Sequence, residues 1–207
     1  YYLQIINLKT HAFHKMTPLL KQYTAIRKEL PEDVLLFFRL GDFYELFMDD
    51  AKNAAGLLGV ALTKRNGMSM CGVPHHAAEG YIGKLVKAGK RVALAEQVGE
   101  VKPGKIVKRE VTQIISAGTV NDLNLLDQAK NNYLAGVFFS QKKYGLAAID
   151  LTTSHFKIAE FDDFTDLEDE LSRISASEII FSEEQDNHFE KLSENIISHD
   201  SYAFLKD

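Results

Sequence analysis

The sequence contains little of what marks several common protein classes. Its 207 residues include one cysteine, Cys71, four prolines and no tryptophan. A single cysteine excludes an internal disulfide, argues against a thiolate zinc site and suits a reducing compartment such as the cytoplasm. No stretch of about 18 apolar residues occurs, so we expect no membrane-spanning helix. Residues 1–15 are too short and too mixed for a secretory signal, and we interpret them as a native extension or an added tag.

A phosphate-binding loop is also missing from the sequence. Gly-Lys pairs begin at Gly83, Gly89 and Gly104, and none of them is followed by Ser or Thr. The Walker pattern needs that hydroxyl residue directly after the lysine, because its oxygen binds the magnesium ion. We therefore expect neither ATP nor another cofactor, and no metal site, within these residues.

The net charge of −5 conceals a difference between the two halves of the chain. Residues 1–130 contain 18 Lys and Arg against 13 Asp and Glu, whereas residues 131–207 contain 6 against 16. A basic first half favours contact with a polyanion such as a nucleic acid, and an acidic second half repels one. Lysines exposed on ordinary helices and loops explain the same counts, so charge alone leaves both interpretations open.

The pattern of the first half predicts alternating helices and strands. Thr17 followed by Pro18 is a helix start, and Pro31 ends that helix. Gly41-Asp42 is turn chemistry between two apolar strands. The prediction comprises helices over residues 18–30, 49–59 and 75–89, and strands over 33–40, 43–47, 60–74 (with a turn at Asn66-Gly67), 91–98 and 109–120.

From residue 133 the pattern changes to closely spaced strands. Strands over 133–140, 144–153 and 155–161 predict an antiparallel meander, followed by a helix over 165–174, a strand over 177–182 and a polar helix over 184–195. Residues 121–132 have helical spacing and polar ends, and we interpret them as a linker. The sequence therefore predicts an α/β protein with two domains, residues 16–120 and 133–207.

One aromatic cluster, FFRLGDFYELF over Phe37–Phe47, contains four phenylalanines and one tyrosine. Strand alternation buries most of these rings. Phe43 differs, because it follows the Gly41-Asp42 turn and is therefore placed near a surface. An apolar wedge can enter the minor groove between base pairs, unstack them and kink the duplex. A carboxylate such as Glu45 can accept a hydrogen bond from a base edge. Packing in the core is the alternative for Phe43.

A second hypothesis uses carboxylates. Asp42 and Glu45, together with Asp150 from the predicted meander, are candidates for a metal-dependent nuclease. No histidine at a fixed helical spacing accompanies them. Asp49 and Asp50 are better explained as acids in the first turn of a helix, where they interact favourably with the helix dipole.

The motifs FFRLGDFYELF, LTKR, CGVPHHA and VALAEQVGE follow one another in this order. Over residues 16–207 the chain closely resembles the N-terminal part of the MutS family of bacterial DNA mismatch repair proteins. The resemblance implies a mixed-sheet α/β mismatch-recognition domain over 16–120 and a connector domain with a ribonuclease H-like α/β fold over 133–207. A relative that binds junctions instead of mismatches is disfavoured by the intact Phe43-Tyr44-Glu45 motif.

The resemblance also implies roles for individual residues. Phe43 is the wedge that stacks on a mispaired or unpaired base, and Glu45 forms a hydrogen bond with that base. The residues implied to flank the turn or to contact the DNA backbone are Leu40, Asp42, Lys64 and Arg65.

For the full-length protein the resemblance implies ATP and magnesium as cofactors and a homodimer that clamps bent, mismatched duplex DNA. It further implies signalling to a MutL-type protein through the connector domain, and a cytoplasmic, nucleoid-associated location in a bacterium. By itself, this chain is then expected to be monomeric, to lack ATPase activity and to bind duplex DNA weakly.

Overall fold

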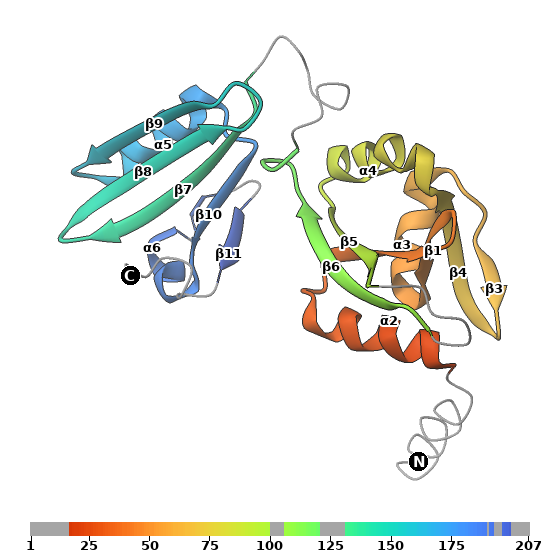
Figure 1. Cartoon of the computed structure of the whole chain (residues 1–207). Helices are drawn as coiled ribbons and strands as arrows, with labels where there is room; N and C mark the ends of the chain where they lie inside the picture. The colour runs from red at the N-terminus through yellow and green to blue at the C-terminus, as the bar shows by residue number, and fades with distance from the viewer. Residues whose placement is uncertain (1–16, 100–105, 121–130, 190, 193–195, 200–207) are drawn as a thin grey trace. The chain divides into compact units, whose positions relative to one another are not determined.

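The computed structural model describes residues 17–99, 106–120, 131–189, 191–192 and 196–199. The chain forms two compact units, each built on its own sheet (Figure 1). The first unit extends to Ile114, except that Val86–Gly89 are grouped with the second unit, which continues from Ile115. The predicted extension over 1–15 and most of the predicted linker over 121–132 lie outside the described residues. Across the described ranges, no helix is both long and apolar enough to cross a membrane.

The first unit is a mixed sheet with helices on both sides. Its strands are β1 (Val34–Leu40), β2 (Phe43–Phe47), β3 (Thr63–Arg65), β4 (Met68–Pro74), β5 (Arg91–Val98) and β6 (Lys108–Ile115). Its helices are α2 (Pro18–Glu29), α3 (Met48–Leu58) and α4 (Ala78–Lys87), the last preceded by the short 3₁₀ turn η2 (His75–Ala77). The strand order is β3-β4-β2-β1-β5-β6, with β1 parallel to β5 and antiparallel to β2.

Local chemistry sets the ends of these helices. The Thr17 hydroxyl accepts a hydrogen bond from the Leu20 N–H at 3.3 Å, and Pro18 is the first helical residue, so α2 begins where the sequence predicts. The C-cap of α3 is Gly59, whose φ of +70° suits a residue without a β-carbon. The predicted helices and turns of this unit therefore follow from short-range signals.

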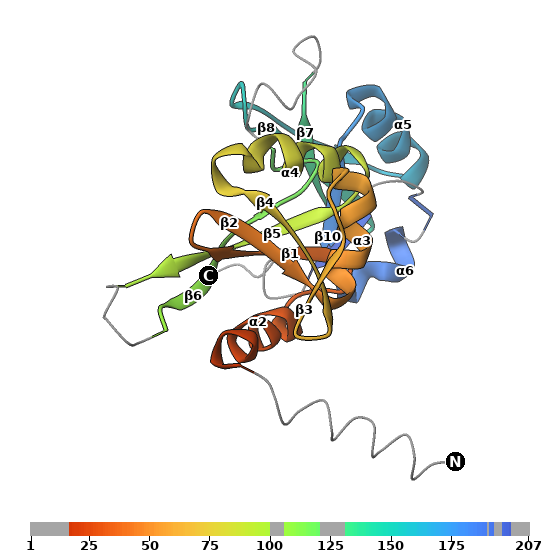
Figure 2. The ribbon, with the colours of Figure 1, turned by 90° about the vertical axis from the view of Figure 1, so that its right-hand side faces the viewer.

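The core lies on both faces of the sheet. On one face Leu20 and Tyr23 of α2 pack against Phe38 and Phe47, with the Tyr23 ring edge-on to both phenylalanines. Figure 2 shows α4 on the opposite side of the sheet from α2. Because both faces are covered, β1 is buried continuously from Val34 to Phe38, as its apolar run predicts.

A buried ion pair joins α2 to α3. The Asp50 side chain is 4% exposed, and its carboxylate accepts hydrogen bonds from the Tyr23 hydroxyl at 2.7 Å, Arg27 Nε at 3.0 Å and the Leu36 N–H at 3.2 Å. Burial, together with the charge of Asp50, raises the pKa of the Tyr23 phenol far above its ordinary value. Asp50 lies in the first turn of α3, as predicted, yet its contacts are mainly tertiary.

The second unit is a five-stranded sheet. Its strands are β7 (Tyr133–Ser140), β8 (Lys143–Asp150), β9 (His155–Phe161), β10 (Glu178–Ser182) and β11 (Ile196–His199), and its helices are α5 (Phe164–Ile174) and α6 (Asp186–Phe189), with the 3₁₀ turn η3 (Glu183–Gln185) between β10 and α6. β7, β8 and β9 form the predicted antiparallel meander, while β10 pairs in parallel with β7 and β11 in parallel with β10.

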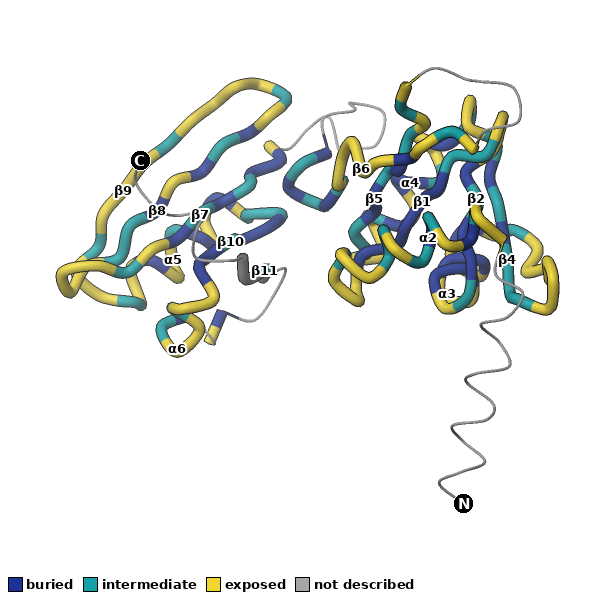
Figure 3. Tube along the Cα trace, turned by 60° about the horizontal axis from the view of Figure 1, so that its bottom comes forward, coloured by how far each residue is buried: buried dark blue, intermediate teal, exposed yellow. Residues whose placement is uncertain are grey.

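One face of this second sheet carries the core. Residues from α5 and α6, such as Leu167 and Phe189, are buried against alternate residues of β7 and β8. Figure 3 shows β9 as exposed along most of its length. Phe156 is 58% and Ile158 75% exposed, because both alternate with the residues that face the helices.

The predicted α/β class is confirmed, and some predicted boundaries are wrong. β6 ends at Ile115, and the predicted strand residues 116–120 instead form a turn in which the Ser116 N–H donates to the Thr119 hydroxyl at 2.8 Å. The predicted helix over 184–195 stops at Phe189, where the Leu192 N–H donates to the Phe189 carbonyl and closes a turn. β11 follows as a short strand that the sequence pattern did not indicate, because it is stabilised by pairing with β10.

Candidate nucleic-acid interface

The β1–β2 hairpin presents its turn to solvent. Leu40 and Phe43 are the last paired residues, so the loop consists of Gly41 and Asp42 alone. Gly41 has a φ of +56°, which a two-residue hairpin loop requires and glycine adopts without strain. Gly41, Asp42 and Phe43 are all exposed, and the Phe43 side chain, at 48%, is the most exposed aromatic ring of the first unit's described residues.

A gradient of exposure runs along one face of β2. Phe43, Glu45 and Phe47 share this face, because alternate residues of a strand point the same way. Phe47 is buried against Tyr23 of α2, Glu45 is intermediate and Phe43 is exposed. The two residues paired with Phe43 across the sheet, Leu40 and Pro74, are themselves only half-buried. Phe43 therefore lies where helix α2 no longer covers the sheet.

Glu45 forms an ion pair with Arg65 of β3. Arg65 Nη1 lies 2.7 Å from Glu45 Oε2, and the side chains are 52% and 15% exposed. Gly72 of β4 is the partner of Glu45 in the ladder, and a Cβ added there would be in ordinary contact with Glu45 Cγ at 3.6 Å but crowded against the Tyr44 carbonyl oxygen at 3.2 Å. A guanidinium–carboxylate pair of this length is a charge-assisted hydrogen bond.

Lys64 and Arg65, adjacent in sequence, lie on opposite faces of the sheet. Arg65 pairs with Met68 and therefore shares the face of Glu45 and Phe43, whereas Lys64 pairs with Ser69 on the other face. Both side chains are exposed, and β3 is an edge strand. The structure therefore brings Arg65 to the face of the predicted reading residues, and it places Lys64 at the same edge but on the other face.

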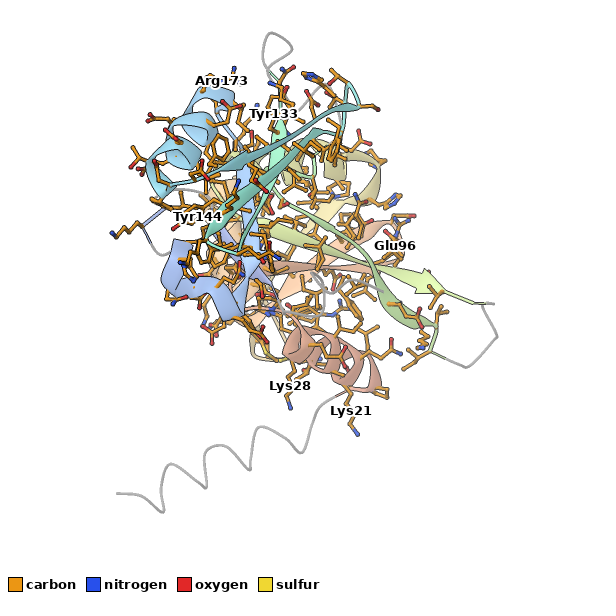
Figure 4. The ribbon with its side chains drawn as sticks, turned by 90° about the vertical axis from the view of Figure 1, so that its left-hand side faces the viewer. Lys21, Lys28, Glu96, Tyr133, Tyr144 and Arg173 are labelled. Carbon is orange, nitrogen blue, oxygen red and sulfur yellow. The ribbon has the colours of Figure 1, made fainter. Side chains whose placement is uncertain are left out.

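The opposite face of the hairpin is held by residues that sequence reasoning did not single out for a site. Arg39 Nε donates to the Gly41 carbonyl at 2.6 Å, and its guanidinium lies 5.6 Å from the centre of the Tyr44 ring. The buried Tyr44 hydroxyl donates a hydrogen bond to Glu96, which Figure 4 labels on β5. Burial, aided by this bond, raises the pKa of Tyr44 well above its ordinary value. The His75 N–H donates to the Asp42 carbonyl at 2.8 Å, so the turn is tied on both sides.

Basic residues of the first unit differ in their availability to a ligand. Lys21 and Lys28 extend outward from α2 (Figure 4), and Lys84 of α4 is exposed. Arg109, by contrast, is only 7% exposed and stacks over Phe38 with 5.2 Å between guanidinium and ring centre, and burial lowers its pKa. Arg109 therefore contributes to the positive charge of residues 1–130, although its side chain is not accessible to a ligand.

The carboxylates of the nuclease hypothesis do not form a metal site. Asp42 is exposed at the turn, Glu45 is paired with Arg65, and Asp150 belongs to the other sheet. Asp150 is fully buried, and its oxygens accept hydrogen bonds from the Thr152 hydroxyl at 2.6 Å and from neighbouring backbone N–H groups. Within the described ranges, no group of three or more His, Cys, Asp or Glu side chains could hold a metal ion. The nuclease hypothesis is not supported.

Comparison with known families agrees with the motifs. The family model described as MutS domain I matches residues 17–124, more than half of the chain, and the model for MutS domain II matches residues 132–202. The chain belongs to the MutS family. The resemblance inferred from the sequence motifs is thereby confirmed.

Two MutS relatives illustrate the similarity. The protein named DNA mismatch repair protein MutS from Syntrophobacter fumaroxidans is 46% identical over 182 residues, which is 84% of this chain and 20% of the relative. A protein of the same name from Pelotomaculum thermopropionicum is 46% identical over 170 residues, 78% of this chain and 20% of the relative. The chain thus spans about a fifth of the length of these MutS relatives.

Proposed function

We propose that this chain recognises mismatched and unpaired bases in duplex DNA, with Phe43 inserted from the minor groove and Glu45 forming a hydrogen bond with the disturbed base. The observation that carries this proposal is the exposure of Phe43 at the end of the β1–β2 hairpin, on the same face as Glu45. Its support includes the relatives named for DNA mismatch repair.

The mechanism depends on how easily DNA deforms. An apolar wedge between two base pairs costs a few kcal/mol of stacking, and this cost is smaller where a pair is already mismatched. Phe43 would respond to that cost, because its exposed ring would insert more readily where stacking is already weakened. Glu45 would add a hydrogen bond that only an unpaired donor on a base edge can make. Binding energy therefore differs between mismatched and matched duplex even though the backbone contacts are the same.

The neighbouring residues have supporting roles in this proposal. Leu40 and Asp42 lie beside Phe43 and would contact the DNA close to the inserted ring. Lys64 and Arg65, exposed on the edge strand β3, would interact with phosphates. These contacts would orient the duplex and would not read sequence.

The proposal extends to the domains and to the full-length protein. We assign residues 16–120 to the mismatch-recognition domain, 121–132 to a linker and 133–207 to the connector domain, the last with a ribonuclease H-like fold. The acidic connector would contact a MutL-type protein and not DNA, because a net negative surface repels phosphates. In the full-length protein, ATP and magnesium would act outside these residues, in a homodimer associated with the bacterial nucleoid, whereas the isolated chain would be a monomer without ATPase activity.

The test compares binding to two duplexes that differ by one mispair. In the full-length protein, Phe43→Ala should reduce the preference for the mismatched duplex about tenfold or more, since stacking on a base contributes about 1–3 kcal/mol. Affinity for the matched duplex should remain within about twofold, because phosphate contacts dominate it. Fluorescence anisotropy with labelled duplexes measures both affinities.

Phe156→Ala is the matched control, because Phe156 is similarly exposed, at 58%, but lies in the second unit. It should leave both affinities unchanged. Equal discrimination by the unmodified protein and by Phe43→Ala would refute the proposed wedge. If Phe156→Ala removed discrimination to the same extent, the loss would be an effect of deleting any exposed aromatic ring, and it would not support insertion of Phe43.

A further inference from the structure

The ion pair between Arg65 and Glu45 is a specific feature of this face that insertion of Phe43 does not require. Partly exposed pairs of this kind add little to stability. Here, however, the carboxylate is only 15% exposed while its partner is 52% exposed, so the pair is anchored at the Glu45 end and open at the Arg65 end. This difference in exposure indicates that the ion pair serves ligand binding and not the stability of the fold.

The bond occupies only part of the Glu45 carboxylate. Arg65 Nη1 donates to Oε2 at 2.7 Å, and among the described residues no donor is bonded to Oε1. Glu45 pairs with Gly72 of β4, and its side chain reaches across β4 to Arg65 on β3. One carboxylate oxygen is thus held by the protein, and the other remains able to accept a hydrogen bond from outside.

We propose that Arg65 is a positioning residue that fixes Glu45 through Oε2 and presents Oε1 to the disturbed base. This inference rests on the proposed role of Glu45 in reading that base. Arg65 also offsets the negative charge of Glu45, which phosphates on either side of a groove would otherwise repel. Arg65 therefore contributes to mismatch discrimination by acting through Glu45, in addition to any phosphate contact made by its remaining N–H groups.

The neighbouring lysine provides a matched control. Lys64 carries the same charge on the same strand and is also exposed, but it lies on the opposite face from Glu45. In the full-length protein, Arg65→Ala should lower the ratio of mismatched to matched duplex affinity about fivefold. Lys64→Ala should weaken binding to both duplexes by a common factor and leave that ratio unchanged. Equal losses for both duplexes in Arg65→Ala would overturn the inference and reduce Arg65 to a phosphate contact.

A double-mutant cycle tests whether Arg65 acts through Glu45. In a Glu45→Ala background, Arg65→Ala should cause no further loss of discrimination, because the positioned group is already gone. Arg65→Lys, which keeps a cation within reach of Oε2, should recover most of the discrimination that Arg65→Ala loses. A further fivefold loss in the Glu45→Ala background, or no recovery with lysine, would contradict the positioning role.

The same measurements separate this inference from the proposed function. Discrimination that survives Phe43→Ala refutes the proposed insertion of Phe43. Discrimination that is lost in Phe43→Ala but kept in Arg65→Ala refutes only the role of Arg65. Far-UV circular dichroism of each variant confirms that the exposed edge strand tolerates the substitution.

Discussion

Replacing Gly41 by alanine should destabilise the first unit, although nothing touches the added methyl group. Gly41 has a φ of +56°, and apart from Gly41 itself and its two chain neighbours no described residue has an atom within 4 Å of the position that a Cβ would take. The cost is therefore entirely that of holding a non-glycine residue in a left-handed conformation, about 1–2 kcal/mol. The smaller conformational entropy of alanine in the unfolded chain offsets part of it. We expect the free energy of unfolding to fall by about 1 kcal/mol.

Gly56→Ala is the matched control, because it makes the same chemical change at another open position. Gly56 lies within α3 at an ordinary helical φ, and again nothing lies within 4 Å of its added Cβ. Alanine should stabilise the helix there by about 0.5–1 kcal/mol. The free energy of unfolding should thus fall in Gly41→Ala and rise in Gly56→Ala, so that the two variants differ by about 2 kcal/mol. Gly41→Asn should lie between them, because asparagine tolerates positive φ better than alanine does.

Urea unfolding followed by far-UV circular dichroism measures these differences, since the sequence has no tryptophan for fluorescence. The same Gly41→Ala protein should also lose part of its mismatch preference, because the turn sets the position of Phe43. The reasoning is refuted if Gly41→Ala and Gly56→Ala change stability in the same direction.

Two further predictions concern buried carboxylates. Asp50→Ala should destabilise the first unit by about 1–3 kcal/mol, because it removes the carboxylate that accepts from Tyr23 and Arg27, although Tyr23 keeps the Phe47 carbonyl and Arg27 keeps three backbone carbonyls as acceptors. Asp49→Ala at the exposed neighbouring position should have little effect on the unfolding midpoint in urea. Burial alone would raise the pKa of Asp150, but hydrogen bonds from Thr152 and nearby backbone N–H groups outweigh it and hold that pKa below its ordinary value. The stabilisation by ionised Asp150 is therefore present above pH about 4 and is lost as the pH falls through the lowered pKa. Asp150→Asn should accordingly flatten the acid side of a plot of melting temperature against pH. An unchanged acid side would contradict this prediction.

Much of the fold could be predicted from the sequence because its signals are local. Thr17-Pro18 starts α2, Gly59 ends α3, and the Gly41-Asp42 turn joins the two predicted strands. Where local signals were weak, the predictions failed. The polar helix expected to extend to residue 195 ends at Phe189, and β11 was not predicted, because a strand of four residues is stabilised by its parallel pairing with β10 and not by its own composition.

The candidate site was only partly readable from the sequence. The position of Phe43 directly after a turn predicted its exposure, and the structure adds that Glu45 lies on the same face of β2. The sequence could not predict that Arg65 pairs with Glu45 while Lys64 lies on the other face, because register across β4 decides it. Nor could composition reveal that Arg109 is buried over Phe38.

By itself, the sequence determined the α/β class, most helices and strands, the MutS family and the exposed ring of Phe43. These features depend on residue types at short spacing, on backbone conformations that glycine and proline favour, and on motifs whose residues are contiguous in the sequence. Only tertiary contacts decided which charges are accessible, which carboxylates are buried, and that Arg65 meets Glu45 across the intervening strand β4. Those properties depend on contacts between residues far apart in the chain, and a contact exists only once the sheet has formed its register.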